Sequence, residues 1–202
     1  MVLFQNSKTR LVGISDGVFA VVLTIMVLNI KVPKGPLSIT QVQSLLQAIF
    51  TYLISFAVVA QYWQYHQECF GHNANLPTGI YILNNCYLSL ICLIPFVTAW
   101  LKESQSSSYS AIVFAIVIAA VDILQLIMFQ RVIRANLQPS QQLSPHDREE
   151  YRSVKMMVVI SGLYLLVSLT VPHLILLIIA AGLTFRVITT RFMRRFKQPP
   201  FN

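Results

Sequence analysis

The sequence contains little charge: only 11% of its 202 residues are Asp, Glu, Lys or Arg, whereas 55% are hydrophobic. Soluble domains carry about a quarter charged residues, so this composition excludes an ordinary soluble domain. Long apolar runs take the place of charge, and the mean hydropathy is +0.64. We therefore predict an all-α polytopic membrane protein in which residues 1–202 form a single domain.

Acidic residues are especially scarce: 7 stand against 15 lysines and arginines, for a net charge of +8. On a soluble protein such an excess would suggest nucleic acid as a partner. Here the basic residues lie between and after apolar runs, as is typical of membrane-surface anchors, so no nucleic-acid partner is expected. The basic tail around Arg191–Lys197 is predicted to bind anionic lipid, with a protein contact as the alternative.

Motifs that carry chemistry are also few. Three cysteines, an odd number, lie in or near apolar segments and indicate no disulfide framework. The sequence shows no nucleophile with a base, no glycine-rich phosphate loop and no paired carboxylates at one depth, so we expect neither an enzyme nor a cofactor. His66, Cys69 and His72 form an HxxCxxH pattern, but a structural zinc site needs four ligands and no fourth is evident, so no metal site is assigned.

The apolar runs and their polar breaks predict six transmembrane helices. Pro33–Pro36 ends the first, and Pro172 with His173 divides a last run that is too long for one span. Between the fourth and fifth spans, Ala135–Lys155 is predicted to be a water-soluble stretch. The predicted spans are about 11–32, 42–66, 79–101, 109–134, 154–171 and 172–190.

The basic residues test this map independently of hydropathy. Six spans place 12 lysines and arginines on one side and the remaining three, Lys31, Lys34 and Lys102, on the other. Short cytoplasmic loops retain positive charge, so both termini are predicted to face the cytoplasm of a multi-pass protein of the cell membrane.

Polar residues gather at the predicted cytoplasmic ends of the first three spans. An aspartate at the entrance of a membrane helix is costly to bury and requires a partner. The map brings Ser15 and Asp16 to the depth at which the second span ends and the third begins, so the candidate partners are Trp63, His66, and Asn84 or Asn85. Two alternatives stay open: Ser15 or Asp16 caps the helix, or the aromatic and histidine side chains form a solvated interfacial belt.

One face of the first span suggests a path for ions. Residues Gly17, Val21, Thr24, Leu28 and Lys31 follow steps of three and four and form a stripe. Several copies around an axis would present a ring of Thr24 hydroxyls between apolar rings of Val21 and Leu28, which closes by dewetting. The alternative is ordinary packing, with the Thr24 hydroxyl bonded back to the carbonyl of Ala20.

Other function classes compete with this pore. Asp122, near the middle of the fourth span, is the residue that a proton-coupled secondary transporter would use. The alternative for Asp122 is a hydrogen bond within the bundle, near Gln125. A non-conducting membrane scaffold, with Ala135–Lys155 as its contact, is a third possibility.

The block Arg10–Pro33, with its core ISDGVFAVVLTIMVLNIKVP, resembles the signature first helix of the transmembrane protein 175 family of endosomal and lysosomal potassium channels and their prokaryotic relatives. Trp63 with His66, the asparagines that open the third span, and Ile94-Pro95-Phe96 match as well. The second half of the chain matches only in hydropathy and length. Ile14 and Val21 depart from the phenylalanine and the common isoleucine of the family.

This resemblance implies a potassium-permeable channel that assembles as a homotetramer around four first helices. The gate and threonine layer would then fall on Val21, Thr24 and Leu28. The network that holds the pore helix would comprise Arg10, Ser15, Asp16, Trp63, His66 and Asn84. Since the sequence has no TVGYG-like filter segment, we expect modest selectivity for potassium over sodium.

Overall fold

The long apolar runs of the sequence form long helices. The computed structural model of the protein describes residues 8–33, 35, 38–71, 75–77, 79–104, 107–138, 141–175 and 177–182. Five α-helices in this part of the chain are long and apolar enough to cross a membrane. The elements are α1 (Lys8–Val27), α2 (Ile39–Cys69), α3 (Ile80–Glu103), α4 (Ser108–Asn136), α5 (Pro145–Thr170) and the short 3₁₀ helix η1 (Pro172–Leu174).

The first helix ends earlier than the sequence predicts. α1 stops at Val27 rather than near residue 32. The next turn is tighter, because the amide of Leu28 donates to the carbonyl of Ile25 at 3.0 Å, three residues back. Pro33 then disfavours helical backbone at the residue before it. Leu28 and Lys31 therefore follow α1 instead of continuing its helical stripe, which corrects the predicted geometry of that stripe.

The fifth helix begins earlier than predicted, at Pro145 rather than near residue 154. The hydroxyl of Ser144 accepts from the amide of Asp147 at 3.0 Å, and proline suits the first helical position. The charged segment that was predicted to be a loop is thus the start of α5. The expectation of a loop over Ala135–Lys155 is therefore wrong for the residues from Pro145 onward, which are helical.

The chain breaks where Pro172 and His173 predict a break. α5 ends at Thr170, η1 follows, and residues 177–182 are helical again. Residues 183–202 lie outside the described part of the chain, and with them most of the predicted sixth span and the basic tail. The number of six spans and the lipid contact of the tail therefore stay predictions.

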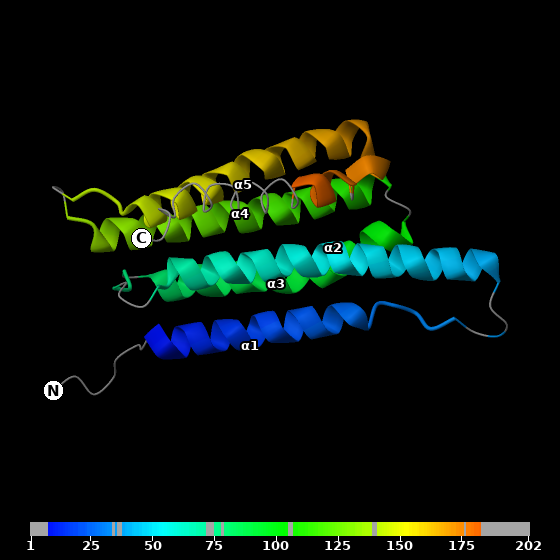
Figure 1. The fold of residues 1–202 in the computed structure, drawn as a ribbon, viewed down its shortest axis with the longest axis horizontal. Coiled ribbons are helices and arrows are strands. Elements are labelled where there is room, and N and C mark those ends of the chain that lie inside the picture. Colours follow the sequence, from blue (N-terminus) through cyan, green and yellow to red (C-terminus); the bar gives the residue numbers. More distant parts are fainter. Residues whose placement is uncertain are drawn as a thin grey trace, which may run out of the picture.

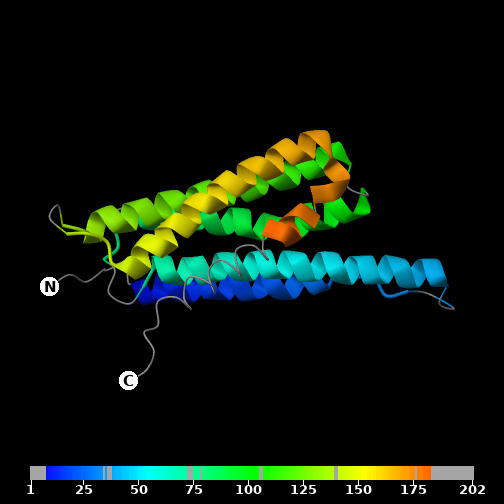
Figure 2. The same cartoon turned by 45° about the horizontal axis from the view of Figure 1, so that its top comes forward.

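The helices run alternately up and down, so that α1 begins where α2 ends, α3 begins, α4 ends and α5 begins (Figure 1). α1 packs against α2 and α3, α3 packs against α4, and α4 packs along α5. Figure 2 shows the same order from a second side, with α5 crossing α4. α1 thus lies at the edge of the bundle, away from α4 and α5.

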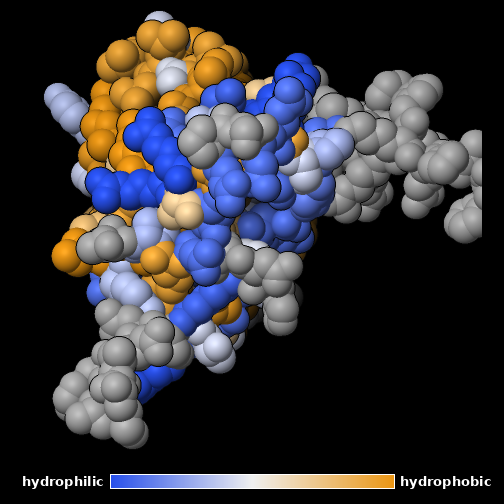
Figure 3. Space-filling model, turned by 90° about the vertical axis from the view of Figure 1, so that its left-hand side faces the viewer, coloured by the Kyte–Doolittle hydropathy of each residue, from blue (hydrophilic) through white to orange (hydrophobic). Residues whose placement is uncertain are grey.

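The end of the bundle at which α1 begins is hydrophilic. Figure 3 looks at this end and shows hydrophilic residues across its face and apolar residues at its margin. Lys8, Arg131, Arg134, Arg148 and Arg152 belong to helix ends at this side of the molecule. This distribution agrees with a water-facing end, and the assignment of that end to the cytoplasm stays a prediction.

Candidate functional site

α1 has one packed face and one unpacked face. Its buried residues, Leu11, Ser15, Phe19, Val22 and Met26, recur every three or four positions and face α2 and α3. In a bilayer such contacts gain little from the hydrophobic effect, so close packing and interhelical hydrogen bonds hold the helix. The opposite face has no covering helix within the described part of the chain.

The three residues predicted to line an ion path lie on this unpacked side. Val21 is 54% exposed, Leu28 is 77% exposed and Thr24 is exposed as well. The Thr24 hydroxyl donates to the carbonyl of Val21 at 2.8 Å. The predicted back-bond is therefore present, but it goes to Val21 and not to Ala20. The hydroxyl oxygen of this exposed side chain can still accept a hydrogen bond.

A buried chain of hydrogen bonds fixes the packed face of α1. Asn84 of α3 donates through Nδ2 to the Ser15 hydroxyl at 3.0 Å, and Ser15 donates to the Leu11 carbonyl at 2.8 Å. The Asn84 Oδ1 atom is then the acceptor for Nε2 of His66 on α2, at 2.8 Å. Ser15, His66 and Asn84 are at most 1% exposed. Three helices are thus joined through one directional chain, and Asn85, the alternative partner, is exposed.

The position of these groups rules out two alternatives. α1 already extends back to Lys8, so Ser15 and Asp16 lie inside the helix and do not cap it. His66 is fully buried and surrounded by aromatic rings, with ring centres of Phe19 and Phe70 at 5.6 and 4.8 Å. A solvated histidine in an interfacial belt is therefore wrong.

Asp16 has its own partners on α2. The indole N–H of Trp63 donates to Asp16 Oδ1 at 2.9 Å, and the Gln67 amide donates to the same oxygen. Sequence reasoning missed Gln67, although its spacing of four from Trp63 puts both on one face of a helix. Two donors from neighbouring turns stabilise the carboxylate at this depth.

The first turn of α1 is also attached to the end of α2. The Lys8 ammonium donates to the carbonyl of Gly71, just after α2. Arg10, the remaining member of the predicted network, is exposed on this first turn. The start of α1 is thus the part of the helix with the most polar contacts, whereas its Val21–Leu28 end presents apolar side chains outward.

Asp122 lies in a second polar cluster, away from α1. It is 1% exposed, and the Tyr62 hydroxyl donates to its Oδ1 atom at 2.8 Å. Gln125, which the sequence placed near Asp122, is buried and accepts from the Tyr87 hydroxyl at 3.4 Å. The predicted hydrogen bond within the bundle is therefore present, with Tyr62 as its donor.

The HxxCxxH pattern is divided by the fold. His66 is bonded to Asn84, Cys69 is buried, and His72 lies outside the described residues. Among the residues that the structure does describe, His, Cys, Asp and Glu side chains form no group of three that could hold a metal ion.

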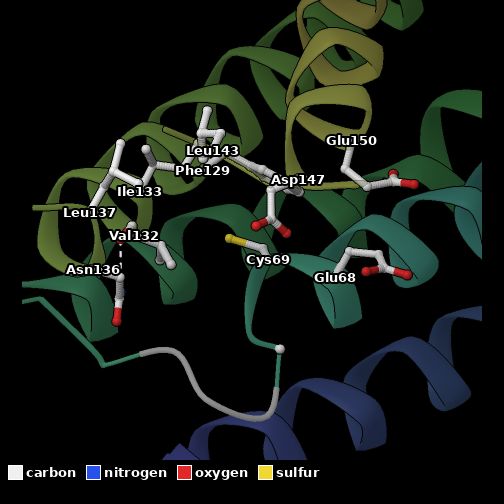
Figure 4. Close-up of a pocket in the computed structure, with 11 residues that line it drawn as sticks. Glu68, Cys69, Phe129, Val132, Ile133, Asn136, Leu137, Leu143, Asp147 and Glu150 are labelled. Atoms are coloured by element: carbon white, nitrogen blue, oxygen red, sulfur yellow. Dashed lines mark hydrogen bonds between the residues drawn. The ribbon is translucent and has the colours of Figure 1, made fainter. Parts of the chain in front are cut away.

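Two larger cavities border the helices. An apolar groove of about 830 Å³ runs between α1 and α3 and is lined by residues including Val21, Ile25 and Phe96. A pocket of about 430 Å³ lies at the end where α2 and α4 finish and α5 begins (Figure 4). There α4 contributes mainly apolar side chains, and Glu68, Asp147 and Glu150 contribute carboxylates from α2 and α5. His146 lies 3.2 Å from Glu68 and connects these two helices.

The part of the chain that contains the polar network is also the part that matches known proteins. A family described as "Endosomal/lysosomal potassium channel TMEM175" matches residues 10–95. A potassium channel of Streptomyces collinus is 31% identical over 123 residues, 57% of this chain and 60% of that protein. A potassium channel of a Chryseobacterium species is 36% identical over 99 residues, 49% of this chain and 51% of that protein. The chain thus matches about half to three fifths of the length of these relatives.

A solved structure extends the likeness to the whole fold. The crystal structure of a lysosomal potassium-selective channel TMEM175 homolog from Chamaesiphon minutus superposes with a TM-score of 0.77 at 23% identity. The match covers 92% of this chain and 98% of that one, and at this identity it shows a shared fold. The predicted resemblance is confirmed for the segment that contains α1, α2 and most of α3: residues 10–95 match the family described as the endosomal/lysosomal potassium channel TMEM175.

Proposed function

We propose that residues 1–202 act as one potassium-permeable channel unit in the cell membrane, with four copies assembled around α1. The observation that carries this proposal is the two-sided character of α1. Its packed face is held by a buried polar network, while Val21, Thr24 and Leu28 are exposed at the edge of the bundle. The names of the matched relatives, potassium channels, support the same function.

In this assembly the exposed side of α1 faces the axis. Rings of Val21 and Leu28 form apolar constrictions that exclude water when narrow, and the Thr24 ring supplies oxygens between them. Because the Thr24 proton is engaged by the Val21 carbonyl, the hydroxyl oxygen is oriented to accept, as a cation requires. Four hydroxyls replace only part of a hydration shell, so selectivity for potassium over sodium is modest.

The network of Arg10, Ser15, Asp16, Trp63, His66 and Asn84 keeps α1 in position. This anchor lies at the start of α1, and the constricting residues lie at its other end.

The test is potassium flux into liposomes that contain the purified protein. Wild type is compared with Thr24→Ala and with Ser89→Ala, a matched control whose exposed hydroxyl also bonds the carbonyl three residues back, but on α3. We expect flux that follows the potassium gradient, an altered potassium-to-sodium ratio in Thr24→Ala, and no change in Ser89→Ala. Equal ratios in all three proteins would remove Thr24 from the ion path.

The same assay separates a channel from a proton-coupled transporter that uses Asp122. A channel conducts without a proton gradient, and Asp122→Asn leaves the flux largely intact because Tyr62 can still donate to the amide oxygen. Flux that requires a proton gradient, or that disappears in Asp122→Asn, would favour the transporter.

A further inference from the structure

An ion pair joins the far ends of α1 and α3. The Lys31 ammonium lies 2.6 Å from Glu103 Oε1, and both side chains are largely exposed, at 78% and 57%. Lys31 follows α1 three residues after Leu28, and Glu103 is the last residue of α3. The pair is therefore at the end of the bundle opposite the buried polar network.

The charge pattern makes this pair unusual. Six of the seven acidic residues of the sequence lie elsewhere: Asp16, Glu68, Asp122, Asp147, Glu149 and Glu150. Glu103 is thus the single acidic residue at the predicted outer end, which also carries Lys31, Lys34 and Lys102. Without Glu103 this end would be entirely positive.

A positive mouth opposes the entry of cations. Charges that line an opening change the local concentration of ions of the opposite and the same sign. Four Lys31 ammonium groups around the axis would lower the local potassium concentration. The contact with Glu103 neutralises each ammonium and draws it toward α3, which packs behind the unpacked face of α1.

We propose that Glu103 determines the rate at which potassium enters from the outer end, by neutralising Lys31 at the mouth of the pore. This inference rests on the proposed channel function and adds a residue outside the pore-lining stripe and outside the polar network. Glu103 acts through Lys31 and is therefore a positioning and charge-balancing residue.

The size of the effect follows from elementary electrostatics. For four unpaired charges about 10 Å from the axis, the screened potential lowers potassium entry roughly two-fold near 150 mM salt and about six-fold near 15 mM. The dependence on salt is the signature, since a merely structural defect would not follow the screening length. An exposed pair contributes little to stability, so the variants should fold like the wild type.

The experiment measures single-channel currents across planar bilayers that contain the full chain, at both salt concentrations and with potassium supplied from the Lys31 side. The variants are Glu103→Gln, Lys31→Gln and the double variant. Glu149→Gln, at the other end of the bundle, is the matched control for the change in net charge. We expect Glu103→Gln to reduce the current with the stated salt dependence, and the double variant to restore it.

The outcomes separate the two proposals. If the wild type conducts and Glu103→Gln conducts equally well, the proposed role of Glu103 is wrong. It is also wrong if Glu103→Gln conducts less and adding Lys31→Gln does not restore the current. In both cases the proposed channel function still stands. An equal loss in Glu149→Gln would assign the effect to net charge instead of the ion pair. A wild-type protein that passes no potassium at either salt concentration would overturn the proposed channel function itself.

Discussion

The buried chain through Asn84 offers the sharpest test of how α1 is held. Replacing Asn84 with leucine keeps the branched shape of the side chain and removes both of its hydrogen bonds. The Ser15 hydroxyl still donates to the Leu11 carbonyl, so it loses one partner of two. His66 loses Asn84 Oδ1 as the partner of its Nε2 atom, and its buried Nδ1 atom has no partner among the described residues.

The expected cost follows from these two losses. Interhelical hydrogen bonds in membranes contribute about 0.6 kcal/mol on average, so the two bonds alone amount to roughly 1.2 kcal/mol. A buried donor left without a partner costs about 1–3 kcal/mol. We therefore expect Asn84→Leu to lower the free energy of unfolding by about 2–4 kcal/mol, of which the stranded imidazole contributes about 1–3 kcal/mol.

The neighbouring asparagine provides a matched control. Asn85 is exposed on α3, so Asn85→Leu should change the free energy of unfolding by no more than about 0.5 kcal/mol. The assay is equilibrium unfolding of the purified protein in mixed micelles, followed by tryptophan fluorescence. If the two leucine variants unfold alike, Asn84 does not anchor α1, and the directional chain from His66 to Leu11 has no energetic role.

Three further predictions concern contacts made by Asp122, Gly162 and Gly182. A Cβ atom at Gly182 would lie 2.3 Å from the Tyr164 hydroxyl, so Gly182→Ala should lower the thermal midpoint, and Tyr164→Phe in the same chain should restore it. Gly162→Ala has open space and should be neutral or slightly stabilising, because alanine favours helix by about 1 kcal/mol. Tyr62→Phe removes a donor from buried Asp122 and should cost about 1–3 kcal/mol in the same unfolding assay; an unchanged midpoint would contradict that contact.

Local signals were sufficient for most of the helices. Pro172 correctly predicted where the chain breaks, whereas the start of α5 at Pro145, capped by Ser144, was missed. The mistakes came where charge was taken as evidence against helix. The charged residues after Pro145 form the first turns of α5, because a helix that leaves the membrane keeps its hydrogen bonds in water and can carry charge.

The contacts of the polar site, too, were predictable from the sequence only in part. The approximate depth of Ser15, His66 and Asn84 followed from the alternation of spans, since each span reverses the direction of the chain. The sequence could not decide between Asn84 and Asn85, because the answer depends on how α3 is rotated about its own axis. In the structure Asn84 faces the bundle and Asn85 does not. Gln67 and Tyr62 were found only in the structure, because glutamine and tyrosine within an apolar run give no sign of which neighbour they meet.

The sequence by itself determined that this protein is an all-helical membrane protein, and it identified α1 as the segment that carries the family signature. It did so because apolar length and the spacing of polar residues are properties of one segment at a time. Only the tertiary structure decided which face of α1 is packed, that Tyr62 is the partner of Asp122, and that Lys31 meets Glu103 across 72 residues of chain. Those facts depend on the rotation and relative height of whole helices, which are set by the simultaneous packing of α1, α2, α3 and α4.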